Sequence, residues 1–419
     1  MSDPAPSHSV AVIGGAVAGA EVAGTLASRG ILVAVIEQNP RPFGKIEDGL
    51  PRWHVALRRK EYQTIGEKLS RPNVDFVPLT SIGRDVRFRE VTQDWGFSAV
   101  VLACGAWRDR PLPVEGADAF LGRGLVYQNP FIIWFNHANE KAYRGPVFEP
   151  RDGAIVVGGG LASIDVVKVL MLETTRAKLR ERGIEVGMVE LEVKGIPKIL
   201  AGLGLAFEDL GLAGCTLYYR RRAEDMPLVE IPEDATPERA AKVLASRAKL
   251  LEKAMEKYRF RVRPLCMPDG LIVEKDRLAG LRFRCTRAEA GKLVASDETF
   301  EARGPYVISS IGSIPEPIEG IETRGELFRF TDWELGRLDG YPNVFSAGNV
   351  VTGKGNIVAS RKHAASVAGK VAEEIAKLPP ANAATLERVR ARVRERQSAV
   401  GYTGDYASWM AKATPPDLE

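Results

Sequence analysis

The N-terminal part of the chain shows two short apolar runs separated by a helical pattern. Residues 10–13 and 32–36 are continuous apolar runs, and between them Ala20, Ala23 and Leu26 recur at helical spacing. Continuous runs of this length are typical of parallel strands that are buried on both faces. A strand, a helix and a second strand in this order predict a βαβ unit.

The same pattern returns further along the chain. An apolar run at residues 154–157 leads through a glycine turn into a helical pattern containing Val166, Val167 and Leu170, and the next clear strand covers residues 215–219. The chain therefore contains a second unit of the same kind. We expect an α/β protein with two Rossmann-like units.

Two other segments have clear local signals. Thr236 is a typical helix cap and Pro237 suits the first helical position, so a helix is expected from there through about Tyr258. Residues 281–285 alternate between apolar side chains and arginines. This alternation predicts a half-exposed strand in which Cys285 faces the core.

The turn after the first apolar run has the composition of a dinucleotide site. Residues 14–19 read Gly-Gly-Ala-Val-Ala-Gly, and Glu37 ends the second apolar run, 18 residues after Gly19. Such a turn lets backbone N–H groups and a helix N-terminus approach a pyrophosphate, while the acid accepts ribose hydroxyls. Ala16 replaces the middle glycine of the motif, and an ordinary βα turn is the alternative interpretation.

The second turn leads to arginines instead of an acid. Gly158, Gly159 and Gly160 precede the helix, Ser163 takes the last small position, and the following strand ends in three arginines at residues 220–222. A guanidinium can bind a 2′-phosphate, which a carboxylate would repel. The alternative is a solvated strand end. The two turns together predict FAD at the first and NADPH at the second, with electrons passing from nicotinamide to flavin.

Composition narrows the class of protein. The chain has 419 residues, 45% of them hydrophobic, and a formal charge of +4, which predicts two or three domains and does not indicate nucleic-acid binding. No stretch approaches the length of a membrane span and the N-terminus lacks the features of a signal peptide, so a cytoplasmic protein is expected. The cysteines are far apart, with no spacing typical of a metal or iron–sulfur site and no neighbouring dithiol. They are Cys104, Cys215, Cys266 and Cys285.

Several motifs resemble the adrenodoxin reductase family of ferredoxin–NADP reductases and, more loosely, the small subunit of glutamate synthase. The likeness extends from about residue 10 to about residue 376. The segments that carry it are 42–45, 49–51 and His54 in the loop that crosses the flavin, 82–86 as the strand beneath the adenine, 101–106 as a crossover strand, 134–136, 307–312, and 219–227 as the arginine loop.

The resemblance implies a glutathione-reductase-type architecture in which an NADP-binding domain is inserted into a discontinuous FAD-binding domain. The FAD domain would comprise residues 9–115 and 315–378, and the NADP domain residues 116–314. Residues 379–419 would form a basic, aromatic tail. We expect this tail to pack on its own domain, and the alternative is that its aromatic residues dock a redox partner or a second subunit.

Site residues follow from the turns and from the resemblance. Those expected to bind FAD are Gly14, Gly15, Ala16, Gly19, Glu37, Gly44, Lys45, Leu50, Ile82, Ala103, Cys104, Gly105, Gly348, Asn349, Gly355, Asn356 and Ile357. Those expected to bind NADP are Gly158, Gly160, Leu161, Ala162, Arg220, Arg221 and Glu224. His54 is the candidate catalytic residue. The family carries Trp or Asp where this chain has Asn349, which brings neither stacking surface nor charge.

The function implied is electron transfer from NADPH through FAD to an external one-electron acceptor, for which we expect a ferredoxin. One alternative is an electron-transfer subunit of a larger enzyme, as in the glutamate synthase relatives. A flavin monooxygenase is a further alternative. Because no dithiol or iron–sulfur cluster is formed by neighbours in the sequence, the electrons are expected to leave the chain for a partner.

Overall fold

The computed structural model describes residues 6–414 apart from 233, 290–291 and 354. The chain divides into two compact units. The first is made of Met1–Arg108 and Ser313–Glu419, and the second of Asp109–Gly312. The two-residue strands β5 (Arg108–Asp109) and β14 (Ser313–Ile314) mark the points where the chain leaves and re-enters the first unit.

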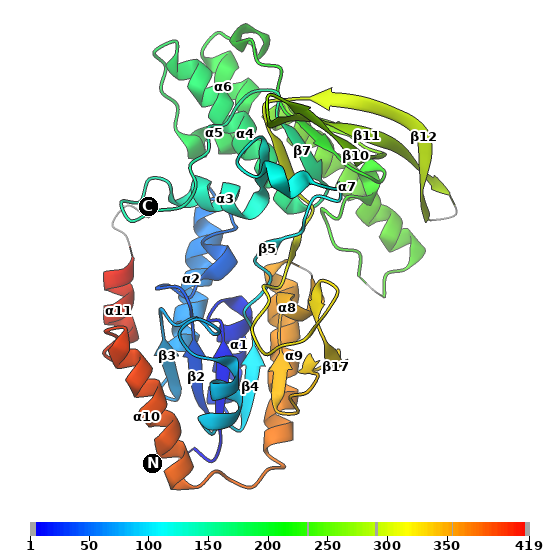
Figure 1. Ribbon diagram of the computed structural model, residues 1–419. Coiled ribbons are helices and arrows are strands. Elements are labelled where there is room, and N and C mark those ends of the chain that lie inside the picture. The colour runs from blue at the N-terminus through cyan, green and yellow to red at the C-terminus, as the bar shows by residue number, and fades with distance from the viewer. Residues whose placement is uncertain (1–5, 233, 290–291, 354, 415–419) are drawn as a thin grey trace. The chain divides into compact units, whose positions relative to one another are not determined.

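A parallel sheet forms the centre of the first unit. Its strand order is β19-β4-β1-β2-β3, with Val10 of β1 paired with Val33 on one side and Ala99 on the other. Strand β19 comes from the C-terminal half of the chain and forms the edge of the sheet beside β4 (Figure 1). The bounds are β1 (Ser9–Ile13), β2 (Leu32–Ile36), β3 (Val74–Val77), β4 (Ala99–Leu102) and β19 (Val344–Ser346).

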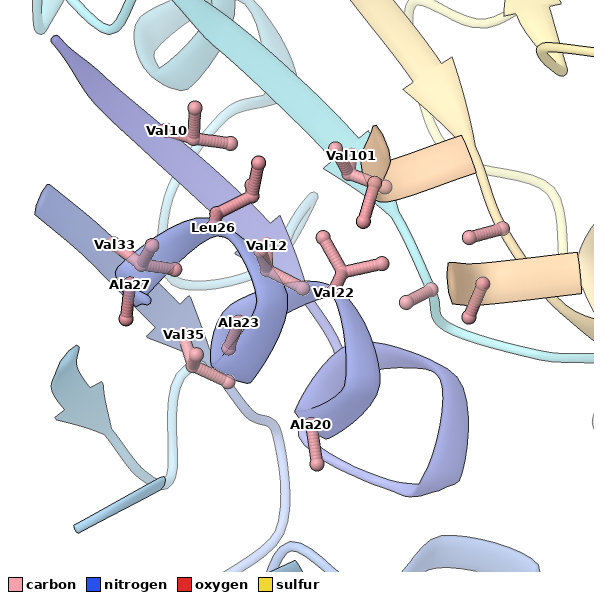
Figure 2. Packing of buried hydrophobic residues seen from close by; sticks show 14 of the residues in the cluster. Val10, Val12, Ala20, Val22, Ala23, Leu26, Ala27, Val33, Val35 and Val101 are labelled. Carbon is pink, nitrogen blue, oxygen red and sulfur yellow. The ribbon is translucent and has the colours of Figure 1, made fainter. Parts of the chain in front are cut away.

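Alternate side chains of this sheet enter two different cores. Val10, Val12 and Val33 pack with Val22 and Leu26, which lie on the covering helix (Figure 2). The strand residues that alternate with these, such as Ala11 and Ala34, belong to a second cluster on the opposite face of the sheet. Because both faces are covered, the strands are continuously apolar. The helices here are α1 (Val17–Ala27), η1 (Gly44–Ile46), α2 (Val55–Leu69), η2 (Glu90–Asp94), α8 (Asn349–Thr352), α9 (Ile357–Ile375), α10 (Ala383–Ala399) and α11 (Tyr406–Ala413).

The C-terminal segment belongs to the first unit. Helix α10 lies beside β3 (Figure 1), and its Gln397 side chain donates to the Phe76 carbonyl at 2.9 Å. The indole of Trp409 donates to the Pro40 carbonyl at 2.7 Å, and Tyr402 is buried. The aromatic residues Tyr402, Tyr406 and Trp409 therefore pack on the core of the first unit.

Residues 82–86 correct one expectation. They do not form a regular strand but a turn, which is closed by an isolated bridge between Ile82 and Val86. The Gly83 N–H donates to the Val86 carbonyl at 2.8 Å, and Gly83 has φ +97°. The short strands that do occur in the later part of this unit are β15 (Thr323–Arg324), β16 (Leu327–Phe328), β17 (Phe330–Asp332) and β18 (Arg337–Leu338).

The second unit repeats the parallel arrangement and adds an antiparallel sheet. Its parallel sheet has the order β6-β13-β7-β8-β9, and β10, β11 and β12 form the antiparallel sheet beside it. The strands are β6 (Leu125–Tyr127), β7 (Ile155–Gly158), β8 (Thr216–Tyr218), β9 (Arg261–Arg263), β10 (Cys266–Glu274), β11 (Arg277–Glu289), β12 (Lys292–Arg303) and β13 (Val307–Ser310).

The helices of the second unit follow their local signals. The Thr236 hydroxyl accepts from the Arg239 N–H at 3.3 Å and so caps the expected helix. The helical segments are η3 (Ala117–Phe120), α3 (Gln128–His137), α4 (Leu161–Arg180), α5 (Met188–Lys194), α6 (Ile196–Gly202), η4 (Glu208–Leu210), η5 (Ala223–Asp225) and α7 (Pro237–Tyr258). None of the helices in the described part of the chain combines the length and the apolar character that a membrane span requires.

We predict that Val393→Ala in α10 destabilises the first unit by about 2 kcal/mol, because Val393 is fully buried against the sheet and the change leaves a cavity. Arg392→Ala is the matched control, since Arg392 is exposed on the same helix and, within the described part of the chain, its ion pair is with Glu395 alone. Urea unfolding followed by tryptophan fluorescence measures both. Equal stability of the two variants would contradict the assignment of α10 to the core.

Candidate functional site

The first glycine turn is shaped by close backbone contacts. Gly14 has φ +99°, and a Cβ on it would lie 2.7 Å from the Ala103 carbonyl oxygen. A Cβ on Gly19 would lie 1.8 Å from the Gly14 carbonyl oxygen. Helix α1 therefore starts directly at the end of β1. Its cap residue, Ala16, makes no side-chain capping bond, which leaves the first N–H groups of the helix for an anion.

Glu37 lies beside this turn and is buried. One carboxylate oxygen accepts the Gly15 N–H at 2.8 Å, and the other accepts the Asn39 N–H at 2.9 Å. Burial raises the pKa of Glu37 to about 7, although the backbone hydrogen bonds oppose that shift. The side chain is therefore fixed in position at the end of β2, where it can accept hydroxyl groups of a bound nucleotide.

The segment after β2 returns to the same turn. Gly44 has φ +48°, and a Cβ on it would lie 2.8 Å from the Ala16 Cβ. The neighbouring Lys45 donates through Nζ to the Ser313 hydroxyl at 3.0 Å and lies over the ring of Trp107, 5.3 Å from its centroid. A Cβ on Gly105 would also come within 3.8 Å of the Trp107 indole nitrogen. Trp107, which no sequence signal singled out, thus joins the expected site residues.

The segment after β19 approaches the turn from the other side. Gly348 has φ +77°, and a Cβ on it would lie 2.6 Å from the Ala18 Cβ. Its N–H donates to Nδ1 of His363 at 2.9 Å. Burial lowers the pKa of His363, which keeps the imidazole neutral and able to accept this bond. This role of His363 is visible only from its position on α9 relative to Gly348.

The side-chain oxygen of Asn349, Oδ1, is buried and has no hydrogen-bond donor among the described residues. Such a group costs free energy unless something binds it. Asn356, in contrast, caps α9 by accepting the Ala359 N–H at 2.7 Å. A Cβ on Gly355 would lie 3.8 Å from the Asn349 amide nitrogen, so the expected residues of this segment lie near one another.

Other expected residues of the first unit have different surroundings. Cys104 lies against Gly14, and burial raises the pKa of its thiol to about 12. Ile82 lies in the turn of residues 82–86 and packs against the second apolar cluster of the first unit. His54 precedes α2, with its ring 6.0 Å from that of Trp53. Leu50 is half-buried and Ile357 is the first residue of α9.

The second glycine turn has a similar shape. A Cβ on Gly158 would lie 2.4 Å from the Ser310 carbonyl oxygen, and one on Gly159 would meet the ring of Tyr219 at 2.1 Å. Gly160 has open space around it and precedes α4 without a side-chain cap. Leu161 is exposed at the helix start and Ala162 is half-buried.

The arginines after β8 lie on the surface of the second unit. Arg222 is paired with Asp225 at 2.9 Å and with Glu224 at 3.3 Å, so Glu224 is engaged within the turn itself. The side chains of Arg220 and Arg221 are exposed and form no hydrogen bond or ion pair with other described residues. Tyr219, whose ring covers Gly159, connects this segment to the glycine turn. Two guanidinium groups are therefore available for an anion.

No protein-family model matches the chain. It is 31% identical over 167 residues to cindoxin reductase of Citrobacter braakii, which covers 39% of this chain and 34% of that protein. It is 27% identical over 176 residues to the mitochondrial NADPH:adrenodoxin oxidoreductase of Arabidopsis thaliana, with 41% and 34% covered. The matched part is thus about a third of each relative's own length. The expected resemblance to adrenodoxin reductase-type oxidoreductases is confirmed.

Among solved structures, the chain is similar to FprA from Mycobacterium tuberculosis in complex with NADPH. The TM-score is 0.72 at 18% sequence identity, and the likeness covers 98% of this chain and 96% of that one. Identity at this level shows the fold alone. The expected α/β fold with two dinucleotide-binding domains is therefore confirmed.

Replacing Glu37 tests the first site. Both carboxylate oxygens of Glu37 accept backbone N–H groups. In Glu37→Gln the side-chain NH2 would face one of these N–H groups, so two donors would oppose each other. Loss of a charged hydrogen bond costs about 1.5–3 kcal/mol, and we expect FAD affinity to fall about tenfold or more. Fluorescence titration of flavin-depleted protein with FAD measures it, with surface Glu90→Gln as the control.

The same titration has an expected pH dependence. Nucleotide hydroxyls bind the ionised carboxylate more strongly, so bound FAD lowers the Glu37 pKa from about 7. FAD affinity should therefore rise as the pH increases toward 7 and then level off. Glu37→Gln should lack this step, and an identical pH profile in both proteins would remove Glu37 from the site.

Proposed function

We propose that the chain is an FAD-containing, NADPH-dependent oxidoreductase that passes electrons to an external one-electron acceptor of the ferredoxin type. The observation that carries this proposal is the difference between the two glycine turns. The first has the buried acid Glu37 beside it, whereas the second has the exposed Arg220 and Arg221, whose side chains bind no other described residue. An acid favours ribose hydroxyls and guanidinium groups favour a 2′-phosphate.

The residues of the first unit fit FAD. The uncapped start of α1 would hold its pyrophosphate, and Glu37 would accept ribose hydroxyls. The orphaned Oδ1 of Asn349 would gain a donor, because FAD carries N–H and hydroxyl groups. When bound, FAD would accept a hydride from NADPH and release its electrons singly.

The chain's own groups serve to position these molecules. Lys45 and Trp107 hold the segment that passes the glycine turn, and His363 holds Gly348 in place through its N–H. Hydride transfer requires alignment more than acid–base chemistry, so no proton-transferring triad is needed. His54 remains a candidate catalytic residue because of its place in the segment that resembles the flavin loop.

The cysteine content of the first unit supports an external acceptor. Cys104 is the single cysteine of the first unit, so that unit has no second thiol with which to form a relay disulfide. The relatives named for cindoxin and adrenodoxin support a small protein carrier as the acceptor. The four cysteines are free thiols, in keeping with a reducing, cytoplasmic location.

The proposed function predicts three properties of the purified protein. It should be yellow with bound FAD, NADPH should reduce that flavin far faster than NADH, and the protein alone should then reduce a ferredoxin. Absorption spectra and rapid mixing measure each step. A colourless preparation that cannot be reconstituted contradicts the proposal. Reduction of the flavin without transfer to any soluble carrier, combined with co-purification of a large partner, would favour the subunit alternative.

Arg221→Ala should weaken NADPH binding by about 1.5–3 kcal/mol and leave NADH binding unchanged, because one charged hydrogen bond to the 2′-phosphate is lost. Arg222→Ala is the matched control, since Arg222 is already paired with Asp225 and Glu224. The dissociation constants come from the NADPH dependence of flavin reduction. If both variants lose affinity equally, or neither does, Arg221 has no such role.

A further inference from the structure

Two cysteines that are distant in the sequence lie opposite each other in the antiparallel sheet of the second unit. Cys266 is the first residue of β10, and its register partner on β11 is Cys285. Both are free thiols. The structure therefore contains a cysteine pair that sequence spacing does not reveal.

The local hydrogen bonds define the kind of pair. The Thr286 N–H donates to the Leu265 carbonyl at 2.8 Å, which makes the adjacent pair a hydrogen-bonded one. Cys266 and Cys285 are therefore a non-hydrogen-bonded pair, whose Cα atoms typically lie about 4.5 Å apart with both side chains on one face. Disulfides form at Cα separations of about 4.4–6.8 Å. The geometry permits a bridge.

The two thiols differ in their access to solvent. Cys266 is 2% exposed, whereas Cys285 is half-buried. Burial raises the pKa of the Cys266 thiol to about 11, and the nearby Cys285 contributes to that increase. An oxidant from solvent therefore meets Cys285 first. The Cys266 thiol donates to the Arg263 carbonyl at 3.1 Å, and it must give up this bond to react with the oxidised Cys285.

The cysteine pair is directly connected to the arginine segment. The Cys266 N–H donates to the Tyr219 carbonyl at 3.0 Å. The residues beside the pair hold the next two carbonyls: the Leu265 N–H donates to that of Arg221 at 3.0 Å, and the Thr286 hydroxyl to that of Arg220 at 2.7 Å. Leu265, Cys266 and Thr286 thus fix the backbone that carries the Arg220 and Arg221 side chains.

We propose that Cys266 and Cys285 form a reversible disulfide that weakens NADPH binding at Arg220 and Arg221. The part of this proposal that concerns NADPH binding rests on the proposed function. Disulfides are most common at a Cα separation of about 5.5–6 Å, wider than the typical spacing of such a pair. Closing the bridge therefore spreads the two strands locally and displaces the carbonyl partners of the arginine segment.

The oxidant is hydrogen peroxide. It oxidises the Cys285 thiol to a sulfenic acid and is reduced to one water molecule. The Cys266 sulfur then attacks the Cys285 sulfur, the S–S bond forms, and the hydroxyl group leaves with the Cys266 proton as a second water. A dithiol reductant restores both thiols. Two thiols and one peroxide therefore give one disulfide and two waters.

The experiment treats the intact flavoprotein with hydrogen peroxide, blocks the remaining thiols by alkylation and maps the linked peptides by mass spectrometry. We expect the number of free thiols to fall from four to two. We also expect a single disulfide-linked peptide, which joins Cys266 to Cys285. The dissociation constant for NADPH should rise several-fold, return after reduction by a dithiol, and be insensitive to peroxide in Cys285→Ser. Cys215→Ser is the matched control and should respond like the wild type.

The outcomes separate this inference from the proposed function. Absence of the linked peptide, a linkage between other cysteines, or a linked peptide with unchanged NADPH affinity overturns the inference and leaves the NADPH reductase proposal intact. Reduced protein that never binds NADPH overturns the proposed function together with the NADPH consequence. Peptide mapping needs no NADPH, so it decides the bridge in either case.

Discussion

The close approach of helix α1 to strand β1 is the constraint on which the first site depends. Gly19 can lie against the Gly14 carbonyl only because it has no side chain, and Gly14 in turn lies against Ala103. The helix therefore begins where the strand ends, at the same sheet edge as Glu37. A Cβ at either glycine would separate helix from strand and move the N–H groups of the helix away from the acid.

Features that depend on short stretches of sequence could be predicted. Both βα turns, and the helix capped by Thr236, follow from residues a few positions apart. Gly14 and Gly158 have in common a backbone contact that a side chain would prevent, and the glycine pattern in the sequence records that requirement directly. The strands are continuously apolar for an equally local reason, which is that both faces of each sheet are covered.

Features that arise from contacts between distant segments could not be predicted. His363 acts on Gly348 only because α9 folds back beside the turn, and nothing in its neighbouring residues indicates this. Residues 82–86 were expected to form a strand because they resemble one in sequence, but the left-handed Gly83 closes them into a turn. Cys285 was expected to be a core residue, yet it is half-buried, and its partner Cys266 becomes visible only once the strands are in register.

The two sites differ in their exposure to solvent, and this difference affects how tightly each would retain its nucleotide. Glu37 can be buried because two backbone N–H groups compensate part of the cost of desolvation, which remains visible in its raised pKa. A nucleotide whose hydroxyl groups donate to Glu37 offsets the desolvation cost that this carboxylate already carries in the folded protein. Slow dissociation of the nucleotide is therefore favoured. Arg220 and Arg221 are exposed, so a phosphate bound to them competes with solvent and can leave with little penalty. A resident flavin and an exchangeable nicotinamide coenzyme require these opposite properties.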